Sequence, residues 1–256
     1  MKRSIILVLV YFLVQFVAGI LCMGVLVVYQ YAITGSFVVT DLVGDAAVPT
    51  LILGFVIMAA ILWRLGYLRP VNEVWNVLTP QYLGWTALMG ISMIFLLDFI
   101  LSVFDFLPNW LEESFDLLES DYVGILAVSV LGPILEEMLF RGAITRELLK
   151  HYKPMNAILI SGLIFGLFHI NPAQVLPAML IGFVLAWLYW RTKSIVPGIV
   201  IHIINNSLSC YLSVAYPDKE SLFDLLGNAA VSFGVLIAAA LLYVSYEKLR
   251  SLPPSP

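Results

Sequence analysis

Hydrophobic residues occupy eight long runs of this 256-residue chain, and the short segments between the runs hold most of its charged residues. A helix of about 20 apolar residues crosses the hydrocarbon core of a bilayer, where backbone polar groups must be hydrogen-bonded within the chain. The pattern therefore predicts an all-α, polytopic membrane bundle of about eight transmembrane helices. The predicted spans cover approximately residues 4–32, 48–67, 84–104, 122–149, 154–170, 173–191, 195–215 and 222–246.

The composition agrees with lipid as the surrounding solvent. The chain is 61% hydrophobic and 12% charged, whereas soluble domains hold about 25% charged residues. Its length suits a single integral membrane domain over residues 1–256. No basic run or aromatic-basic patch indicates nucleic acid as a partner. The lipid bilayer is the first partner that the sequence predicts.

The charged residues between the runs predict the orientation of the chain. If the amino terminus is cytoplasmic, only Lys219 among the loop cations falls outside, and the opposite loops are acidic, which is the distribution typical of membrane proteins. Both termini are then cytoplasmic. The cations on the cytoplasmic side are Lys2, Arg3, Arg64, Arg69, Arg146, Lys150, Lys153, Arg191, Lys193, Lys248 and Arg250. The acids of the opposite loops are Asp41, Asp45, Asp105, Glu112, Glu113, Asp116, Glu119 and Asp121.

The segment from Asp105 to Ser120 alternates acids with large apolar residues such as Phe106, Trp110 and Leu117. Such a mixture is typical of a helix that lies in the plane of the membrane interface. A plain loop explains the composition equally well. Both interpretations stay open from the sequence.

Ionisable residues inside membrane spans are costly, and they usually serve a function. The fourth run contains Glu136 and Glu137 side by side, followed by Arg141. Residues four apart share a helix face, so Glu137 is predicted to pair with Arg141. Glu136 points about 100° away and lacks a partner on its own helix. We therefore expect Glu136 to face a functional cavity. A lone Asp98 in the third run is interpreted as a contact between helices.

Two further runs carry polar residues at helical spacing. The fifth run places Phe165 one turn before His169, and the seventh places His202 one turn before Asn206. Each pair alone is compatible with ordinary helix packing. Counted along ideal helices, Glu136 and Asn206 lie about 21 and 17 Å from the cytoplasmic ends of their spans, His202 about 11 Å and His169 about 24 Å. A tilted or re-entrant fifth span would bring His169 to the others.

These side chains together suit the hydrolysis of an amide bond. The reaction needs a base that activates water, and a carboxylate in a cavity of low dielectric is a better base than one in water. It also needs hydrogen-bond donors for the tetrahedral oxyanion, which an asparagine amide and an imidazole N–H can supply. The chemistry therefore predicts a peptidase site among the helices.

The ordered segments Glu-Glu-x-x-x-Arg, Phe-x-x-x-His and His-x-x-x-Asn resemble the motifs of a family of intramembrane proteases, over approximately residues 122–210. This family joins the type II CAAX prenyl endopeptidases to bacteriocin-processing and Abi-like immunity proteins. The resemblance implies that Glu136 activates the hydrolytic water and that His169 holds this water or transfers a proton. It implies that His202 and Asn206 stabilise the oxyanion. Glu137, Arg141 and Phe165 are implied to support the site.

The resemblance also implies a peptide or membrane-protein substrate, either membrane-associated or a prenylated or leader peptide. The short chain is similar to prokaryotic members, which predicts the inner membrane of a prokaryotic cell. Family members are described both as metal-dependent and as metal-free. Glu136, His169 and His202 could bind Zn²⁺, but the sequence lacks the zinc motif His-Glu-x-x-His. We favour a mechanism without a cofactor.

Two other functions are compatible with the same residues. The chain could be a non-enzymatic adapter or immunity protein that keeps the protease fold and acts by binding another membrane protein. It could also be a transporter that uses the buried polar groups for a proton or cation, although no internal repeat is evident in the sequence.

Overall fold

The computed structural model describes residues 1–36, 42–76, 78–102, 107–219 and 222–253, and every regular element within these ranges is a helix. Seven helical segments are long and apolar enough to cross a membrane. They are α1 (Lys2–Thr34), α2 (Leu42–Arg64), α4 (Pro80–Leu101), the continuous segment Tyr122–Leu149, α10 (Pro172–Thr192), α11 (Val196–Ala215) and α13 (Asn228–Ser251). The predicted all-helical membrane fold is confirmed.

Two of the eight predicted spans differ from the structure. The fifth is α9 (Pro154–Phe168), whose 15 residues extend roughly 22 Å, less than the thickness of the hydrocarbon core. The eighth is broken at Gly227, where a φ of 78° ends the short helix α12 (Leu222–Leu226) before α13 begins. A right-handed helix cannot continue through a residue in that conformation.

The fourth span changes its helical geometry along its length. It consists of α6 (Tyr122–Leu126), the π-helix η1 (Ala127–Leu131), α7 (Gly132–Glu137), the π-helix η2 (Met138–Thr145) and α8 (Arg146–Leu149). Pro133 is the second residue of α7 and cannot donate a backbone hydrogen bond. Wide turns of this kind are common at functional sites. The two glutamates lie at the junction between α7 and η2.

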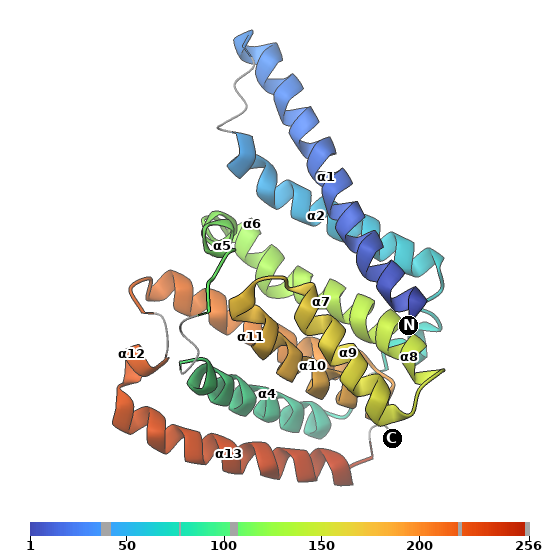
Figure 1. Cartoon of the computed structure of the whole chain (residues 1–256), viewed down its shortest axis with the longest axis vertical. Helices are drawn as coiled ribbons and strands as arrows, with labels where there is room; N and C mark the ends of the chain where they lie inside the picture. Colours follow the sequence, from blue (N-terminus) through green and yellow to red (C-terminus); the bar gives the residue numbers. More distant parts are fainter. Residues whose placement is uncertain (37–41, 77, 103–106, 220–221, 254–256) are drawn as a thin grey trace.

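Figure 1 shows the fourth span together with α9, α10 and α11 at the centre of the molecule. The pair α1–α2 covers one side of this central group, and the pair α4–α13 covers the other. α9 and α10 form a tightly packed hairpin, in which Gly162 and Gly166 lie against Phe183, Met179 and Gly182. Small residues four apart allow this close approach of two membrane helices.

Contacts hold the basic ends of the helices together at one end of the bundle. Arg3 at the start of α1 donates to Glu147 in α8, and Arg146 donates to the Tyr67 and Arg69 carbonyls after α2. Arg191 at the end of α10 donates to backbone carbonyls at the end of α13. The predicted clustering of cations is therefore present. Their placement in the cytoplasm stays a prediction.

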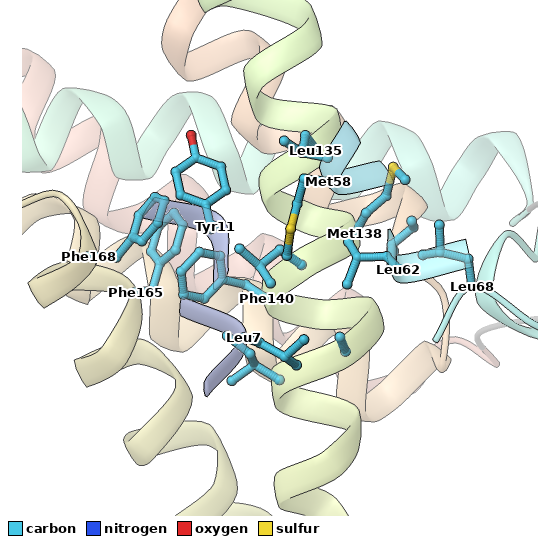
Figure 2. Packing of buried hydrophobic residues seen from close by; sticks show 14 of the residues in the cluster. Leu7, Tyr11, Met58, Leu62, Leu68, Leu135, Met138, Phe140, Phe165 and Phe168 are labelled. Carbon is cyan, nitrogen blue, oxygen red and sulfur yellow. The ribbon is translucent and has the colours of Figure 1, made fainter. Parts of the chain in front are cut away.

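Buried aromatic residues join α1 to the central helices. The ring of Tyr11 contacts Phe168 edge-on, with the ring centroids 4.8 Å apart, and Phe140 of η2 contacts both Phe165 and Phe168 (Figure 2). By contrast, large apolar side chains on the outer faces are exposed, for example Leu236 at 70%. A membrane protein turns such residues towards lipid, since acyl chains solvate them.

The segment before the fourth span contains α5 (Glu112–Glu119), so this part is helical rather than a plain loop. Leu117 and Leu118 line a groove shared with α2. The acids Asp41 and Asp105, and Phe106 of the predicted interfacial segment, lie outside the described residues.

Asp98 in α4 accepts a hydrogen bond from the Leu222 N–H at the start of α12, which confirms its interpretation as a contact between helices. Short α3 (Val71–Val74) follows α2.

Candidate active site

Glu136 lies between two imidazole rings that come from different helices. Its Oε2 is 3.6 Å from His202 Nε2 and 4.0 Å from His169 Nε2. The carboxylate belongs to α7, His169 directly follows α9, and His202 belongs to α11. The side chains of Glu136 and His169 remain 17% and 19% exposed, whereas that of His202 is 6% exposed. The structure therefore brings these three predicted site residues together within a partly accessible space.

The short α9 is what places His169 at the depth of Glu136. The helix ends at Phe168, and a tight turn follows in which Ile170 has a φ of 60°. Asn171 holds this turn: its Oδ1 accepts from the Trp110 N–H and its Nδ2 donates to Asn109. The early end of α9 and the turn after it bring His169 to Glu136, although counting along ideal helices places the two residues at different depths.

Glu137 is completely buried and has two partners. Its Oε1 accepts from Arg141 Nη1 at 2.7 Å, which confirms the predicted pairing, and lies 3.3 Å from His202 Nδ1. The guanidinium of Arg141, also fully buried, donates to the Gly182 carbonyl and lies 4.3 Å from the centroid of the Phe165 ring. Glu137 therefore contacts His202 of the site directly. The four-residue spacing that predicts its pairing with Arg141 does not reveal this second contact.

The partners of each imidazole determine which nitrogen carries the proton. His169 Nδ1 lies 2.8 Å from the Phe165 carbonyl, which can only accept, so this nitrogen is the donor. His202 Nδ1 faces Glu137 Oε1, an oxygen that already accepts from Arg141, so this ring nitrogen is likewise the donor. In both neutral rings Nε2 then carries a lone pair. Both lone pairs face Glu136 Oε2, which accepts no hydrogen bond from the described residues.

Three acceptor atoms that converge in this way suit a donor such as water. A water oxygen about 2.8 Å from each of two acceptors can bridge atoms that are less than about 5.6 Å apart, and both separations at Glu136 meet this condition. The arrangement can therefore hold a water molecule against the carboxylate.

Phe165 lies under both rings. Its ring meets His169 edge-on with the centroids 4.8 Å apart, and it meets His202 in the same manner at 5.7 Å. Phe165 is 1% exposed. It contacts both imidazoles, and its supporting role stays a prediction.

Asn206 lies one turn after His202 on α11 and contacts the fourth span. Its Nδ2 donates to the Val128 carbonyl in η1 at 3.0 Å, and its Oδ1 accepts from Asn205. An amide nitrogen has two N–H groups, so one remains for a substrate. Among the described residues, no contact is recorded between Asn206 and Glu136. The predicted oxyanion role of Asn206 therefore stays a prediction.

The choice between a metal-free mechanism and one with Zn²⁺ stays a prediction. Among the residues that the structure describes, no group of three histidine, cysteine or acidic side chains is placed to bind a metal ion. Two atoms that each lie about 2.1 Å from one ion are roughly 3.4 Å apart at a tetrahedral angle. Glu136 Oε2 lies 3.6 and 4.0 Å from the two nitrogen atoms, so only small movements would bring the three atoms to one ion.

Comparison with known proteins identifies the segment that carries these residues. Residues 119–208 match a family model described as "Type II CAAX prenyl endopeptidase Rce1-like". The matched range includes all the site residues predicted from the sequence, which are Glu136, Glu137, Arg141, Phe165, His169, His202 and Asn206. Residues 119–208 are therefore similar to the Rce1-like family.

Two bacterial proteins are similar to this chain. The Putative membrane peptidase YdiL of Bacillus subtilis (strain 168) is 37% identical over 92 residues, which are 36% of this chain and 38% of YdiL. The UPF0177 protein YxdF of Lactococcus lactis (strain IL1403) is 27% identical over 185 residues, which are 67% of this chain and 96% of YxdF. The alignment with YdiL thus spans well under two thirds of that protein. No solved structure matches the chain.

The sequence did not point to three other residues that shape the Rce1-like site. Gly198 leaves room for the Glu137 carboxylate, and Gly182, whose carbonyl accepts from Arg141, packs closely against Gly162 and Phe165. Nothing in the local pattern of either glycine reveals these neighbours. Tyr11 of α1 packs edge-on against Phe168, the residue before His169, with the ring centroids 4.8 Å apart. It lies outside the Rce1-like segment, in a run that resembles an ordinary span, so only the packing of α1 places it there.

Substitution of Gly198 by alanine is expected to disrupt the Rce1-like site. A methyl group at this position would overlap Glu137 Oε2, whose carboxylate is held by Arg141 and His202. Overpacking of this kind costs about 1–3 kcal/mol, so the variant should melt at a lower temperature in detergent. Gly84→Ala is the control, because a methyl group there meets no atom within 4 Å. Equal melting temperatures for the two variants would contradict the contact.

Proposed function

We propose that this chain is an intramembrane endopeptidase that hydrolyses a peptide bond by means of water activated by Glu136. The observation that carries the proposal is the convergence of Glu136 Oε2 with the Nε2 atoms of His169 and His202 from three segments of the fold. The match of residues 119–208 to a peptidase family supports it, as does the name of YdiL.

The proposed reaction begins with a water molecule held between Glu136 and the His169 lone pair. The carboxylate takes one proton from the water, and the resulting hydroxide attacks the carbonyl carbon of the substrate. The C–N bond then breaks, and Glu136 returns the proton to the leaving amine. The products are a carboxylic acid and an amine, and the enzyme regains its starting state.

The oxyanion of the tetrahedral intermediate needs donors that point into the same space. We assign this role to the remaining N–H of Asn206 and to His202. Because His202 Nδ1 already donates to Glu137, its Nε2 donates only when the ring is protonated.

We propose a membrane-associated peptide, either prenylated or a leader peptide, as the substrate. The side chains of Glu136 and His169 retain exposure, while the surrounding helices turn large apolar residues outward, so a lipid-anchored or membrane-inserted peptide can approach from the bilayer. The bacterial relatives favour the inner membrane of a prokaryotic cell. With the cationic ends of the helices in the cytoplasm, both termini are cytoplasmic.

The test is a cleavage assay with purified protein in lipid nanodiscs, a prenylated peptide and a library of membrane peptides. We expect new peptide termini by mass spectrometry and incorporation of one oxygen from H₂¹⁸O into the new carboxylate. Cleavage should persist after treatment with 1,10-phenanthroline, since the proposed base needs no metal. Loss of cleavage with chelator and recovery with Zn²⁺ would refute the metal-free mechanism. A protein that binds peptides without cleaving any would be an adapter, and ion flux in liposomes would indicate a transporter.

A further inference from the structure

A second polar site lies at the end of the bundle where the basic helix ends gather. A cavity of about 240 Å³ is lined by Glu73, Arg146, Lys150, Tyr189 and Lys193, together with apolar side chains. The lining comes from α3, α8, the segment beyond α8 and the end of α10. Arg146 lies ten residues beyond Glu136, roughly 15 Å along a helix. This cavity is therefore separate from the candidate active site.

The cavity is lined by three cationic side chains and one acidic side chain. The hydrogen bonds that these cations make within the protein leave N–H groups that can bind an anion. Arg146 uses only Nη1 for the recorded bonds, which go to two backbone carbonyls. Lys150 donates to Glu147, whose carboxylate also pairs with Arg3. A guanidinium has five N–H groups and an ammonium three. The bonds of Arg146 and Lys150 therefore leave most of their N–H groups available to an anion.

Of the three cations, Lys193 has the fewest neighbouring groups that offset its positive charge. Within the described ranges, no hydrogen bond or ion pair is recorded for its ammonium group. Partial burial lowers the pKa of Lys193, and no carboxylate offsets this effect. Its backbone adopts the left-handed conformation at the end of α10, with a φ of 57°. Glycine is the residue usually preferred at that position, so the lysine is retained at a conformational cost.

When these helices cross a bilayer, the cavity faces the headgroup region. It lies at the ends of two spans, since the fourth span ends at Leu149 and α10 ends at Thr192. Basic pockets at such positions suit the phosphate groups of anionic lipids. The hydroxyl of Tyr189 adds a neutral donor to the lining.

We propose that this cavity binds a phosphate group, with Arg146, Lys150 and Lys193 as its cationic ligands. The group belongs either to the headgroup of an anionic phospholipid or to a soluble phosphate. Both sources present the same oxygen atoms to the three cations. A bound anion would stabilise the packing of the helix ends. It would not take part in peptide cleavage.

The test is a titration of purified protein in detergent with phosphatidylglycerol, phosphatidylcholine or inorganic phosphate, followed by thermal unfolding. We expect phosphatidylglycerol to raise the melting temperature and phosphatidylcholine to have little effect. Lys193→Gly should weaken the apparent affinity about tenfold, the usual effect of losing a charge-assisted hydrogen bond. Because glycine suits the left-handed backbone at this position, the variant should fold at least as well as the parent.

Lys248→Gln is the matched control. Lys248 lies in the last turn of α13 at the same end of the bundle, and it is not part of the cavity lining. This variant removes the same charge and should bind as the parent does. Equal weakening by the two variants would show general attraction of anions and overturn the site, as would no response to either anion. An equal response to inorganic phosphate would identify the soluble source, and a response to the lipid alone would identify the headgroup.

Discussion

Glu136→Gln is expected to lower the rate of peptide cleavage roughly 10²–10⁴-fold, the range typical for loss of a general base. The amide keeps the size of the side chain but cannot take a proton from water. Since Glu136 is flanked by His169 and His202 without a cation of its own, the substitution leaves no charged partner unpaired. The melting temperature should therefore change little.

The measurement is single-turnover cleavage of whichever peptide the purified protein hydrolyses, with melting in detergent as the check on folding. Asp98→Asn is the matched control, because Asp98 is also a carboxylate within a span. It accepts a hydrogen bond from the Leu222 N–H, and an asparagine oxygen can accept the same bond. Full activity of Glu136→Gln, with normal folding, would eliminate Glu136 as the base and with it the proposed mechanism.

Arg141→Met is expected to destabilise the protein by about 3–5 kcal/mol, the usual cost of removing one partner from a buried ion pair. Arg141 and Glu137 have no exposed side-chain surface. The substitution leaves the Glu137 carboxylate buried beside His202 without its principal cation, and the Gly182 carbonyl loses a donor. Unfolding in a denaturing detergent should reveal the loss.

A double variant tests whether the unpaired charge causes the effect. Glu137→Gln combined with Arg141→Met removes both charges and should recover much of the stability, because a buried pair replaced as a whole is often tolerated. Arg250→Met is the control, since the pair of Arg250 with Glu247 lies at the surface and such pairs contribute at most about 1 kcal/mol. Similar melting of the Arg141→Met and Arg250→Met variants would contradict a structural role for the buried pair.

The approximate positions of the spans followed from the sequence because lipid demands continuous apolar helices. The break at Gly227 did not, since the run remains hydrophobic on both sides of it. The fifth run also appeared long enough to form a span, yet its helix ends at Phe168. Hydrophobicity alone does not distinguish a residue within a helix from one in a buried turn.

The sequence by itself determined the helical membrane class, the pairing of Glu137 with Arg141 and the set of unusual polar residues, because these depend on local spacing and on the cost of charge in lipid. Only the tertiary structure decided that His169 reaches Glu136, that Glu137 also contacts His202, and that Gly198 leaves space for this contact. These relations join residues more than 30 positions apart. They depend on where α9 ends and on how closely α11 packs against the fourth span, which no local pattern specifies.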